Sequence, residues 1–231
     1  MKLRDLTAKI LSRRDDSADP LRIVQAGHPA LRASSAAFTD QLDADELSAL
    51  LRAMVITMHE APGVGVAAPQ IGLPLRLVVM EDSVGFDEEE GEDPLERRDL
   101  PLHCIANPRY EGVGETVVYA WEGCLSVDGW RSIVPRHQQV RVRGTVIGAD
   151  GSRRDLDEVW SGWPARIFQH EADHLDGILC HDRAVDRSMI WEDYAPYYEE
   201  LTDAVDYLGL TGPITELNPG EVAHTRSASQ S

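Results

Sequence analysis

The sequence predicts an α+β fold in which antiparallel and mixed β-sheets pack around a central helix that carries a His-Glu-x-x-His motif. From about residue 104 to residue 158, short runs alternate apolar and polar residues, as strands with one buried face do. A segment with helical spacing precedes these runs, and another follows them. Because the strands succeed one another without intervening helices, this order favours α+β over alternating α/β.

The first helix is expected from Leu47 to Met58, where apolar residues recur at helical spacing. Asp43 and Glu46 before it have the spacing of a capping box. The branched run LRLVVM at 75–80 then predicts a strand. The helix and this strand are joined by a loop rich in small residues.

The later elements follow from turn signals. The sequence ADG at 149–151 predicts a hairpin between two strands. A second helix is expected to open at Trp163 and Pro164 and to end at Gly177, because proline suits a first turn and glycine a helix end. A further amphipathic helix is expected after Pro196.

The composition is that of an ordinary globular protein, with 42% hydrophobic and 27% charged residues. No apolar run approaches the roughly 18 residues of a membrane helix. Aspartates among the first twenty residues are unlike a signal or transit peptide. We therefore expect a cytoplasmic protein that does not enter a membrane, and whose three cysteines are reduced thiols.

Acidic residues are concentrated in two segments. Residues 81–99 hold ten acids against two arginines, and residues 186–231 hold nine acids against two arginines, in a chain of net charge −18. Because binding to a phosphate backbone depends on Lys and Arg, we expect no direct binding of nucleic acid. The plain interpretation of the acids is that they keep the protein soluble and monomeric.

We expect the 231-residue chain to form one main domain with flanking segments. Residues 1–19 are expected as a polar lead-in and residues 20–185 as the main domain, with 81–99 as an acidic surface insertion. Residues 186–210 are expected as a helical extension and residues 211–231 as a flexible tail.

The stretch QHEADHLDG, residues 169–177, places two histidines four positions apart. On a helix, His170 and His174 lie about 40° apart around the axis and face one point in space. Glu171 beside them supplies a proton acceptor, as in zinc peptidases. The alternative is two surface histidines on an ordinary helix. A catalytic metal site usually takes three protein ligands, so a third is needed.

Two further stretches bear on this site. In EGCLS, residues 122–126, Cys124 is either a core thiol or a soft metal ligand that completes a set with the two histidines. In GVGVAAPQ, residues 63–70, the small residues form a plain turn or leave backbone amides accessible to a substrate. Gln70 then offers an uncharged donor where negative charge develops on a carbonyl oxygen.

Together these three stretches resemble the peptide deformylases, metal hydrolases that remove the formyl group from the amino terminus of new bacterial-type proteins. That family has a glycine-rich segment ending in Gln, then Glu-Gly-Cys-x-Ser, then Gln-His-Glu-x-Asp-His-Leu-x-Gly, in the order found here. The resemblance covers about residues 20–185, which would be the catalytic metallohydrolase domain. One departure is Asp128-Gly129, where proline is more usual at the first position.

The resemblance implies one divalent metal ion per chain, with Fe²⁺ expected and Zn²⁺, Ni²⁺ or Co²⁺ accepted. Its ligands would be Cys124, His170 and His174. Glu171 would be the general base that accepts a proton from water and returns it to the leaving amine. Products would be formate and a free amino terminus.

The resemblance also implies how the substrate is held. Gln70 and the backbone amide of Leu125 would stabilise the oxyanion, the backbone around Gly65 would pair with the peptide, and Arg131 would lie near its side chains. Glu122 and Arg136 would buttress the site. The partners would be N-formylmethionyl nascent peptides, which implies transient proximity to the ribosome, here without a basic binding tail.

Two rival interpretations use Cys180 and His181. A zinc endopeptidase is one, since HEADHLDG also begins the longer His-Glu-x-x-His-x-x-Gly-x-x-His pattern, with Cys180 at the third-histidine position. The other is a binding protein with a closed structural metal site, in which Cys180 or His181 supplies a fourth ligand.

Overall fold

The computed structural model describes residues 2–84 and 93–225. Within these ranges, seven strands form one sheet in the order β1-β2-β3-β4-β5, with β6 paired to β4 and β7 paired to β3. Every pair of these seven strands is antiparallel. The strands are β1 (Gly65–Ala67), β2 (Leu77–Asp82), β3 (Leu100–Gly123), β4 (Trp130–Ile147), β5 (Arg153–Ser161), β6 (Ile190–Trp191) and β7 (Ala223–Thr225).

The helices are α1 (Leu3–Leu11), α2 (Ala44–Glu60), α3 (Gly162–Leu175) and α4 (Leu201–Leu208). The α+β class is therefore confirmed. The expected mixed sheets are not found among the described residues, where the only parallel contact is an isolated bridge between Ala36 and Leu75. Parallel strands need long crossover connections, whereas β3, β4 and β5 follow one another through turns.

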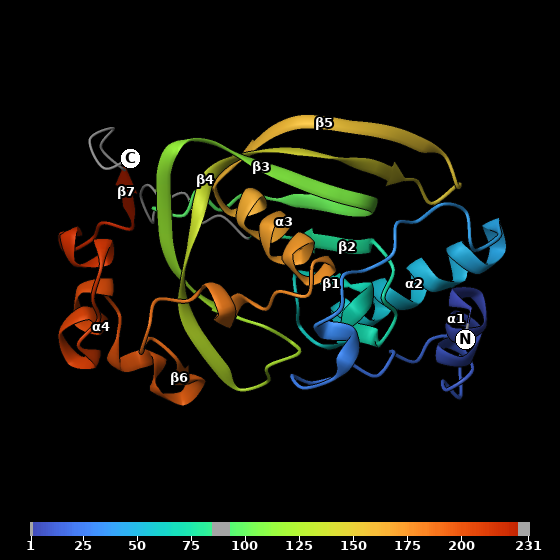
Figure 1. Cartoon of the computed structure of the whole chain (residues 1–231), viewed down its shortest axis with the longest axis horizontal. Helices are drawn as coiled ribbons and strands as arrows, with labels where there is room; N and C mark the ends of the chain where they lie inside the picture. The colour runs from blue at the N-terminus through green and yellow to red at the C-terminus, as the bar shows by residue number, and fades with distance from the viewer. Residues whose placement is uncertain (1, 85–92, 226–231) are drawn as a thin grey trace.

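Helix α3 lies against the sheet near the middle of the molecule, between the α1–α2 end and the α4 end (Figure 1). Its buried side contains Ala165, Phe168 and Leu175, which belong to one apolar cluster with Val140 and Val142 of β4. Gly177 just after the helix has φ +76°, a left-handed conformation that ends the helix at little steric cost. The helix expected from 163 to 177 is confirmed with small differences at its ends.

Helix α2 covers a second apolar cluster beside β1 and β2. Its start has the capping box expected from Asp43 and Glu46, with each side chain bonded to the other's backbone N–H at 3.0 Å. Met54 and Met58 on its buried side are fully enclosed. This helix holds the sheet edge at β1 in place, since the two share the same core.

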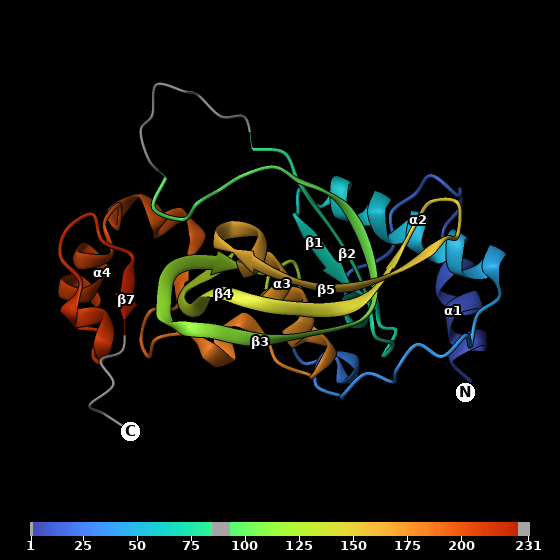
Figure 2. The same cartoon turned by 90° about the horizontal axis from the view of Figure 1, so that it is seen from above.

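The two ends of the chain are more ordered than their polarity indicates. The expected polar lead-in 1–19 contains α1, whose Ile10 is buried in the α2 cluster. The prediction of a flexible tail is wrong for residues 211–225, because Ile214 and Leu217 are buried and β7 extends the sheet at β3. Figure 2 shows α4 and β7 together at the end of the molecule opposite α1.

Part of the acidic insertion 81–99, residues 85–92, lies outside the described residues. Glu81 and Asp82 are the last residues of β2, and the chain re-enters the sheet with β3 at Leu100. In the described parts of the chain, no helix has the length and apolarity to cross a membrane.

Candidate active site

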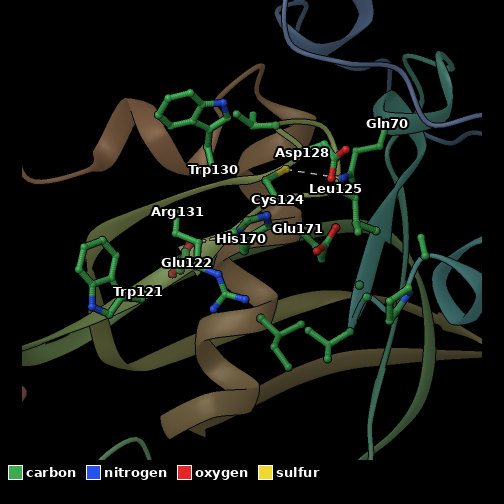
Figure 3. Close-up of a pocket in the computed structure, with 18 of the residues that line it drawn as sticks. Gln70, Trp121, Glu122, Cys124, Leu125, Asp128, Trp130, Arg131, His170 and Glu171 are labelled. Atoms are coloured by element: carbon green, nitrogen blue, oxygen red, sulfur yellow. Dashed lines mark hydrogen bonds and ion pairs between the residues drawn. The ribbon is translucent and has the colours of Figure 1, made fainter. Parts of the chain in front are cut away.

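Three segments far apart in the sequence line one pocket of about 510 Å³ (Figure 3). They are the loop and strand at 63–70, the end of β3 with the turn after it at 122–125, and the middle of α3. These are the three stretches that the sequence indicates. Apolar walls come from the indole rings of Trp121, Trp130 and Trp163. The pocket therefore combines apolar and polar side chains, as small-ligand sites do.

Cys124 and His170 line this pocket, and His174 is buried next to them. One ligand atom from each lies within 4.8 Å of the other two, and the Cys124 Sγ lies 3.4 Å from the His174 Nε2. The two imidazole rings have centroids 5.0 Å apart and an interplanar angle of 70°. The helical spacing of the histidines thus brings both rings to the same sulfur.

The protonation of Cys124 and His174 suits metal binding. At His170, burial acts to lower the pKa, but hydrogen bonds with Cys124 and Glu122 hold that pKa well above its usual value. A hydrogen bond from Cys180, opposed by burial and assisted by His170, lowers the pKa of the Cys124 thiol to about 5. Burial, with the neighbouring His170, lowers the pKa of His174 to about 4. A thiolate and a neutral imidazole are the forms that bind a cation. One sulfur and two nitrogens are a donor set that suits zinc or ferrous iron, so Cys124, His170 and His174 fit a divalent ion of this kind.

Glu171 points into the pocket beside these donors and is 4% exposed (Figure 3). Its Oε2 is buried without a hydrogen-bond partner. Burial raises the pKa of this carboxyl above its usual value, against the attraction of both histidines. A Cβ at Gly65 would overlap the carboxylate, so the second glycine of GVGVAAPQ is required by the position of Glu171.

Gln70 is fixed with its amide nitrogen toward the pocket. Its Oε1 accepts a hydrogen bond of 2.8 Å from the backbone N–H of Ala67, and its Nε2 lies 3.8 Å from the Cys124 sulfur. Leu125 lines the same pocket. In the described part of the chain, no hydrogen bond engages its backbone N–H. Two uncharged donors therefore flank the metal ligands.

Glu122 and Arg136 form a buried pair behind His170. Arg136 donates to both Glu122 oxygens, at 2.7 and 2.9 Å, and Arg166 donates to Oε1 as well. Glu122 Oε2 lies 3.0 Å from His170 Nδ1, which leaves His170 Nε2 for the pocket. Burial acts to raise the pKa of Glu122, but the two guanidinium groups hold that pKa well below its usual value. The pair therefore fixes the orientation of His170.

Asp173 extends this cluster to the other side of α3. It accepts hydrogen bonds from Arg136 at 2.7 Å, from Arg183 at 2.7 and 2.9 Å, and from Tyr110 at 2.8 Å. Neither Asp173 nor Arg166 is among the site residues expected from the sequence. The available signal was their place inside the short helix that holds the two histidines.

The rim of the pocket contains residues from a distant part of the chain. Arg131 lies there on β4, as expected, beside the exposed Trp130. The Trp191 ring packs at 5.6 Å from that of Trp130, and the Trp191 ring occupies the space above Gly129. Trp191 lies on β6, and the next residue, Glu192, lines the pocket, so the segment after residue 186 contributes to the rim, which no local motif indicated.

The rival ligands Cys180 and His181 lie on the short 3₁₀ turn at Cys180–Arg183. The Cys180 sulfur lies in a second group of ligand atoms with Glu122 and His170, also within 4.8 Å of one another. His181 is in neither group among the described residues, and its Nδ1 lies 2.7 Å from the Ser132 hydroxyl. Cys180, which stands at the third-histidine position of the endopeptidase pattern, thus lies near the candidate site but behind it.

A family model described as polypeptide deformylase matches residues 20–189. The chain is 47% identical over 170 residues to peptide deformylase 3 of Streptomyces avermitilis, covering 74% of each protein. It is 44% identical over 193 residues to peptide deformylase 1 of Bifidobacterium longum, covering 82% of this chain and 86% of that protein.

Solved structures give the same result. A class I type b peptide deformylase from Acinetobacter baumannii bound to Met-Ala-Ser matches with a TM-score of 0.60 and 30% identity, over 72% of this chain and 99% of the other. A peptide deformylase from Synechococcus elongatus in complex with actinonin matches with a TM-score of 0.58 and 30% identity, over 82% of this chain and 86% of the other.

Proposed function

The chain belongs to the polypeptide deformylase family, and from this premise we propose how its own residues carry out the family's reaction. The protein is a metal-dependent hydrolase that removes the N-formyl group from the N-terminal methionine of newly made proteins and releases formate. The observation that supports the residue roles best is the convergence of Cys124, His170 and His174 beside an unpartnered Glu171.

Cys124, His170 and His174 would hold one divalent cation, with α3 as the helix that carries two of the three ligands. When bound, the cation supplies a Lewis acid that polarises a carbonyl oxygen and makes water a stronger acid. We propose Fe²⁺ as the native ion, with Zn²⁺, Ni²⁺ or Co²⁺ as substitutes, because the set combines a soft thiolate with imidazoles. Cys180 and His181 are not needed as ligands in this arrangement.

Glu171 would accept a proton from the attacking water and return it to the leaving amine. The unpartnered Oε2 supports this role, because a base needs a lone pair that no other donor occupies. Burial raises the pKa of this carboxyl above its usual value, which strengthens it as a proton acceptor. Glu122 and Arg136 would keep His170 oriented during these steps. The bond that breaks is the formyl carbon to nitrogen bond, and the bond that forms joins that carbon to the water oxygen.

Gln70 and the Leu125 amide would donate to the formyl oxygen as it becomes negative. The hydrogen bond from Ala67 fixes the Gln70 amide so that its NH₂ group faces the pocket. Donors that are already oriented need no rearrangement when charge develops. The cost of removing such a donor falls on turnover rather than on metal binding.

The peptide would bind along β1. This strand ends the sheet path, so one of its edges pairs with β2, and the other pairs with no strand among the described residues and could pair with a peptide backbone. Gly65 at its start lets the peptide pass close to Glu171, and Arg131 at the rim would lie near the peptide's side chains. We also propose a cytoplasmic location with transient ribosome proximity, since the substrates are nascent chains.

The test of this assignment compares three cysteine variants. We expect Cys124→Ala to lose the metal and formate release from a formyl-Met-Ala-Ser peptide. Cys180→Ala should keep both and lose at most about 1 kcal/mol of unfolding free energy, and Cys104→Ala serves as the distant control. Metal stoichiometry and formate are measured on each variant. If Cys180→Ala lost the metal while Cys124→Ala kept it, the ligand assignment would be wrong and an endopeptidase-like or structural site would replace it.

A further inference from the structure

The turn at residues 124–129 joins β3 to β4 and carries the Leu125 N–H, one of the two oxyanion donors. Cys124, Asp128 and Trp130 lie together at one side of the pocket (Figure 3). Turns are held less firmly than strands, because their backbone groups have fewer fixed partners. An oxyanion donor nevertheless has to be oriented before charge develops. The contacts that fix this turn therefore decide how well the Leu125 N–H can act.

The direction of the Leu125 N–H is set within its own peptide unit. This N–H and the Cys124 carbonyl belong to one planar unit, in which the two groups point in opposite directions. The Cys124 carbonyl accepts a hydrogen bond of 2.8 Å from the Val127 N–H. Because that bond holds the carbonyl toward the inside of the turn, the Leu125 N–H faces outward.

The same relation recurs at the end of the turn. The Trp130 N–H lies 3.3 Å from the Val127 carbonyl, to which it donates. The Gly129 carbonyl, in the same peptide unit as the Trp130 N–H, accepts a hydrogen bond of 2.9 Å from the Glu192 N–H. Backbone hydrogen bonds thus lead stepwise from Glu192 to the unit that carries the Leu125 N–H. Bonds in such a chain orient and polarise one another.

The Trp191 ring holds the same end of the turn by packing. Strand β6 pairs with the start of β4, where Trp191 lies opposite Trp130, and their ring centroids are 5.6 Å apart. Gly129 has φ +77°, and a Cβ there would meet the Trp191 ring at 2.4 Å. The glycine of Asp128-Gly129 is therefore required by this contact. Residues 190–192 lie beyond the range 20–189 that the family model matches, so the contact comes from outside the matched domain.

The beginning of the turn is held from another side. The Ala26 N–H donates to the Ser126 carbonyl at 2.8 Å, and the Gln25 Nε2 donates to the Leu125 carbonyl at 2.9 Å. These bonds fix the units that follow the Leu125 N–H. The end of the turn at Gly129 depends instead on β6 and the residue after it.

We propose that Trp191 and Glu192 are positioning residues for the oxyanion site: the Trp191 ring and the Glu192 N–H hold the turn after Cys124 in the conformation that aims the Leu125 N–H at the formyl oxygen. This inference depends on the proposed function, because it gives the Leu125 N–H a role only in deformylation. Both residues act through the turn. Their loss should therefore reduce turnover more than it reduces the binding of substrate or metal.

The experiment compares Glu192→Pro with Glu192→Ala in the full chain loaded with Zn²⁺. Proline lacks the N–H, and its φ suits the first position of the 3₁₀ helix Glu192–Tyr197. Trp191 before it has φ −69° and ψ 136°, the extended conformation that a residue before proline prefers. Both variants lose the carboxylate, so the difference between them reports the N–H.

We expect kcat for formyl-Met-Ala-Ser to be about tenfold lower in Glu192→Pro than in Glu192→Ala, a part of the roughly 10²- to 10³-fold cost of losing a whole oxyanion donor. KM and Zn²⁺ stoichiometry should agree between the two variants. The Kd of the product Met-Ala-Ser should also agree, because this peptide has no formyl oxygen. Trp191→Ala should lower kcat as well, and Trp191→Phe should restore most of it, since it keeps a ring over Gly129.

A purely structural role gives a different result. The variants would then lose unfolding free energy in urea, while kcat per folded molecule stayed equal in Glu192→Pro and Glu192→Ala, and this outcome would overturn the proposal. A loss of Zn²⁺ in step with kcat would overturn it too. Failure of the proposed function is recognised separately, because the wild type itself would then release no formate from the formyl peptide.

Discussion

Two carboxylates on helix α3, Glu171 and Asp173, lie two residues apart and are both buried, yet their surroundings are opposite. Asp173 accepts hydrogen bonds from two arginines and a tyrosine. Glu171 has one oxygen without a partner. Burial favours the protonated form of both, but Arg136 and Arg183 outweigh it at Asp173 and lower that pKa, whereas burial prevails at Glu171 and raises that pKa.

The difference separates a structural role from a chemical one. A carboxylate whose lone pairs are filled by cations has no capacity left for a substrate proton, and its loss leaves buried charges uncompensated. A carboxylate that is buried but unpartnered weakens the fold and is retained where a proton must be accepted. We therefore assign Asp173 to the fold and Glu171 to the reaction.

The largest effect should come from breaking the hydrogen-bonded cluster around Asp173. Arg136→Met leaves Glu122 and Asp173 without their shared partner, and removing one member of a buried ion cluster costs about 3–5 kcal/mol of unfolding free energy. Urea unfolding measures the loss. Arg141→Met is the matched control, because Arg141 makes an equally short pair with Asp157 in solvent, and it should change stability little. Equal losses in both variants would contradict the assignment of the buried cluster.

The next effect concerns the pocket that contains Glu171, which Gln70 also lines. Gln70→Leu removes a donor that faces the pocket while keeping a side chain of similar size. We expect turnover of formyl-Met-Ala-Ser to fall about 10²- to 10³-fold, with metal stoichiometry unchanged because Gln70 is not a ligand. Should metal content fall in step with turnover, Gln70 would belong to the structure of the metal site and not to the oxyanion site.

The sequence predicted the local parts of this account well. The capping residues Asp43 and Glu46 lie within four positions of one another, and the helical spacing of His170 and His174 fixes their common direction. Cys124 could be identified as a ligand only from the order of three motifs, because its contact with the helix depends on how the β3–β4 hairpin packs on α3. Each of these was encoded within a few residues or by a recognisable pattern.

The rest depends on contacts between distant segments. Asp173 stabilises the fold through its hydrogen bonds with Arg136 on β4 and with Arg183, which follows α3. Ile214 and Leu217 are buried only because the chain after α4 returns to β3, so their polar neighbours suggested a loose tail. Sequence patterns report which residues can be buried, and they do not report which distant partner buries them.

A smaller effect is expected in the dependence of stability on pH. The pKa of Asp173 is lowered in the folded protein, so its ionisation contributes stability that is present above the unfolded pKa of about 3.9 and is lost as the pH falls through the folded value. We expect the unfolding free energy of the wild type to decrease as the pH is lowered below about 5. Asp173→Asn should be less stable at neutral pH and show a shallower acid decrease. An unchanged slope would mean that Asp173 is not held as an anion.

The most direct test of the central claim compares Glu171→Gln with Asp173→Asn, since each replaces one buried carboxylate by its amide. We expect Glu171→Gln to keep its metal and its stability and to lose about 10²- to 10⁴-fold in formate release. Asp173→Asn should lose about 3–5 kcal/mol of unfolding free energy, while its folded fraction keeps turnover within about tenfold of the wild type. Metal stoichiometry, urea unfolding and formate release are measured on both. If Glu171→Gln retained turnover within a few-fold of the wild type, Glu171 would not be the base, and the contrast between the two carboxylates would not be one of function.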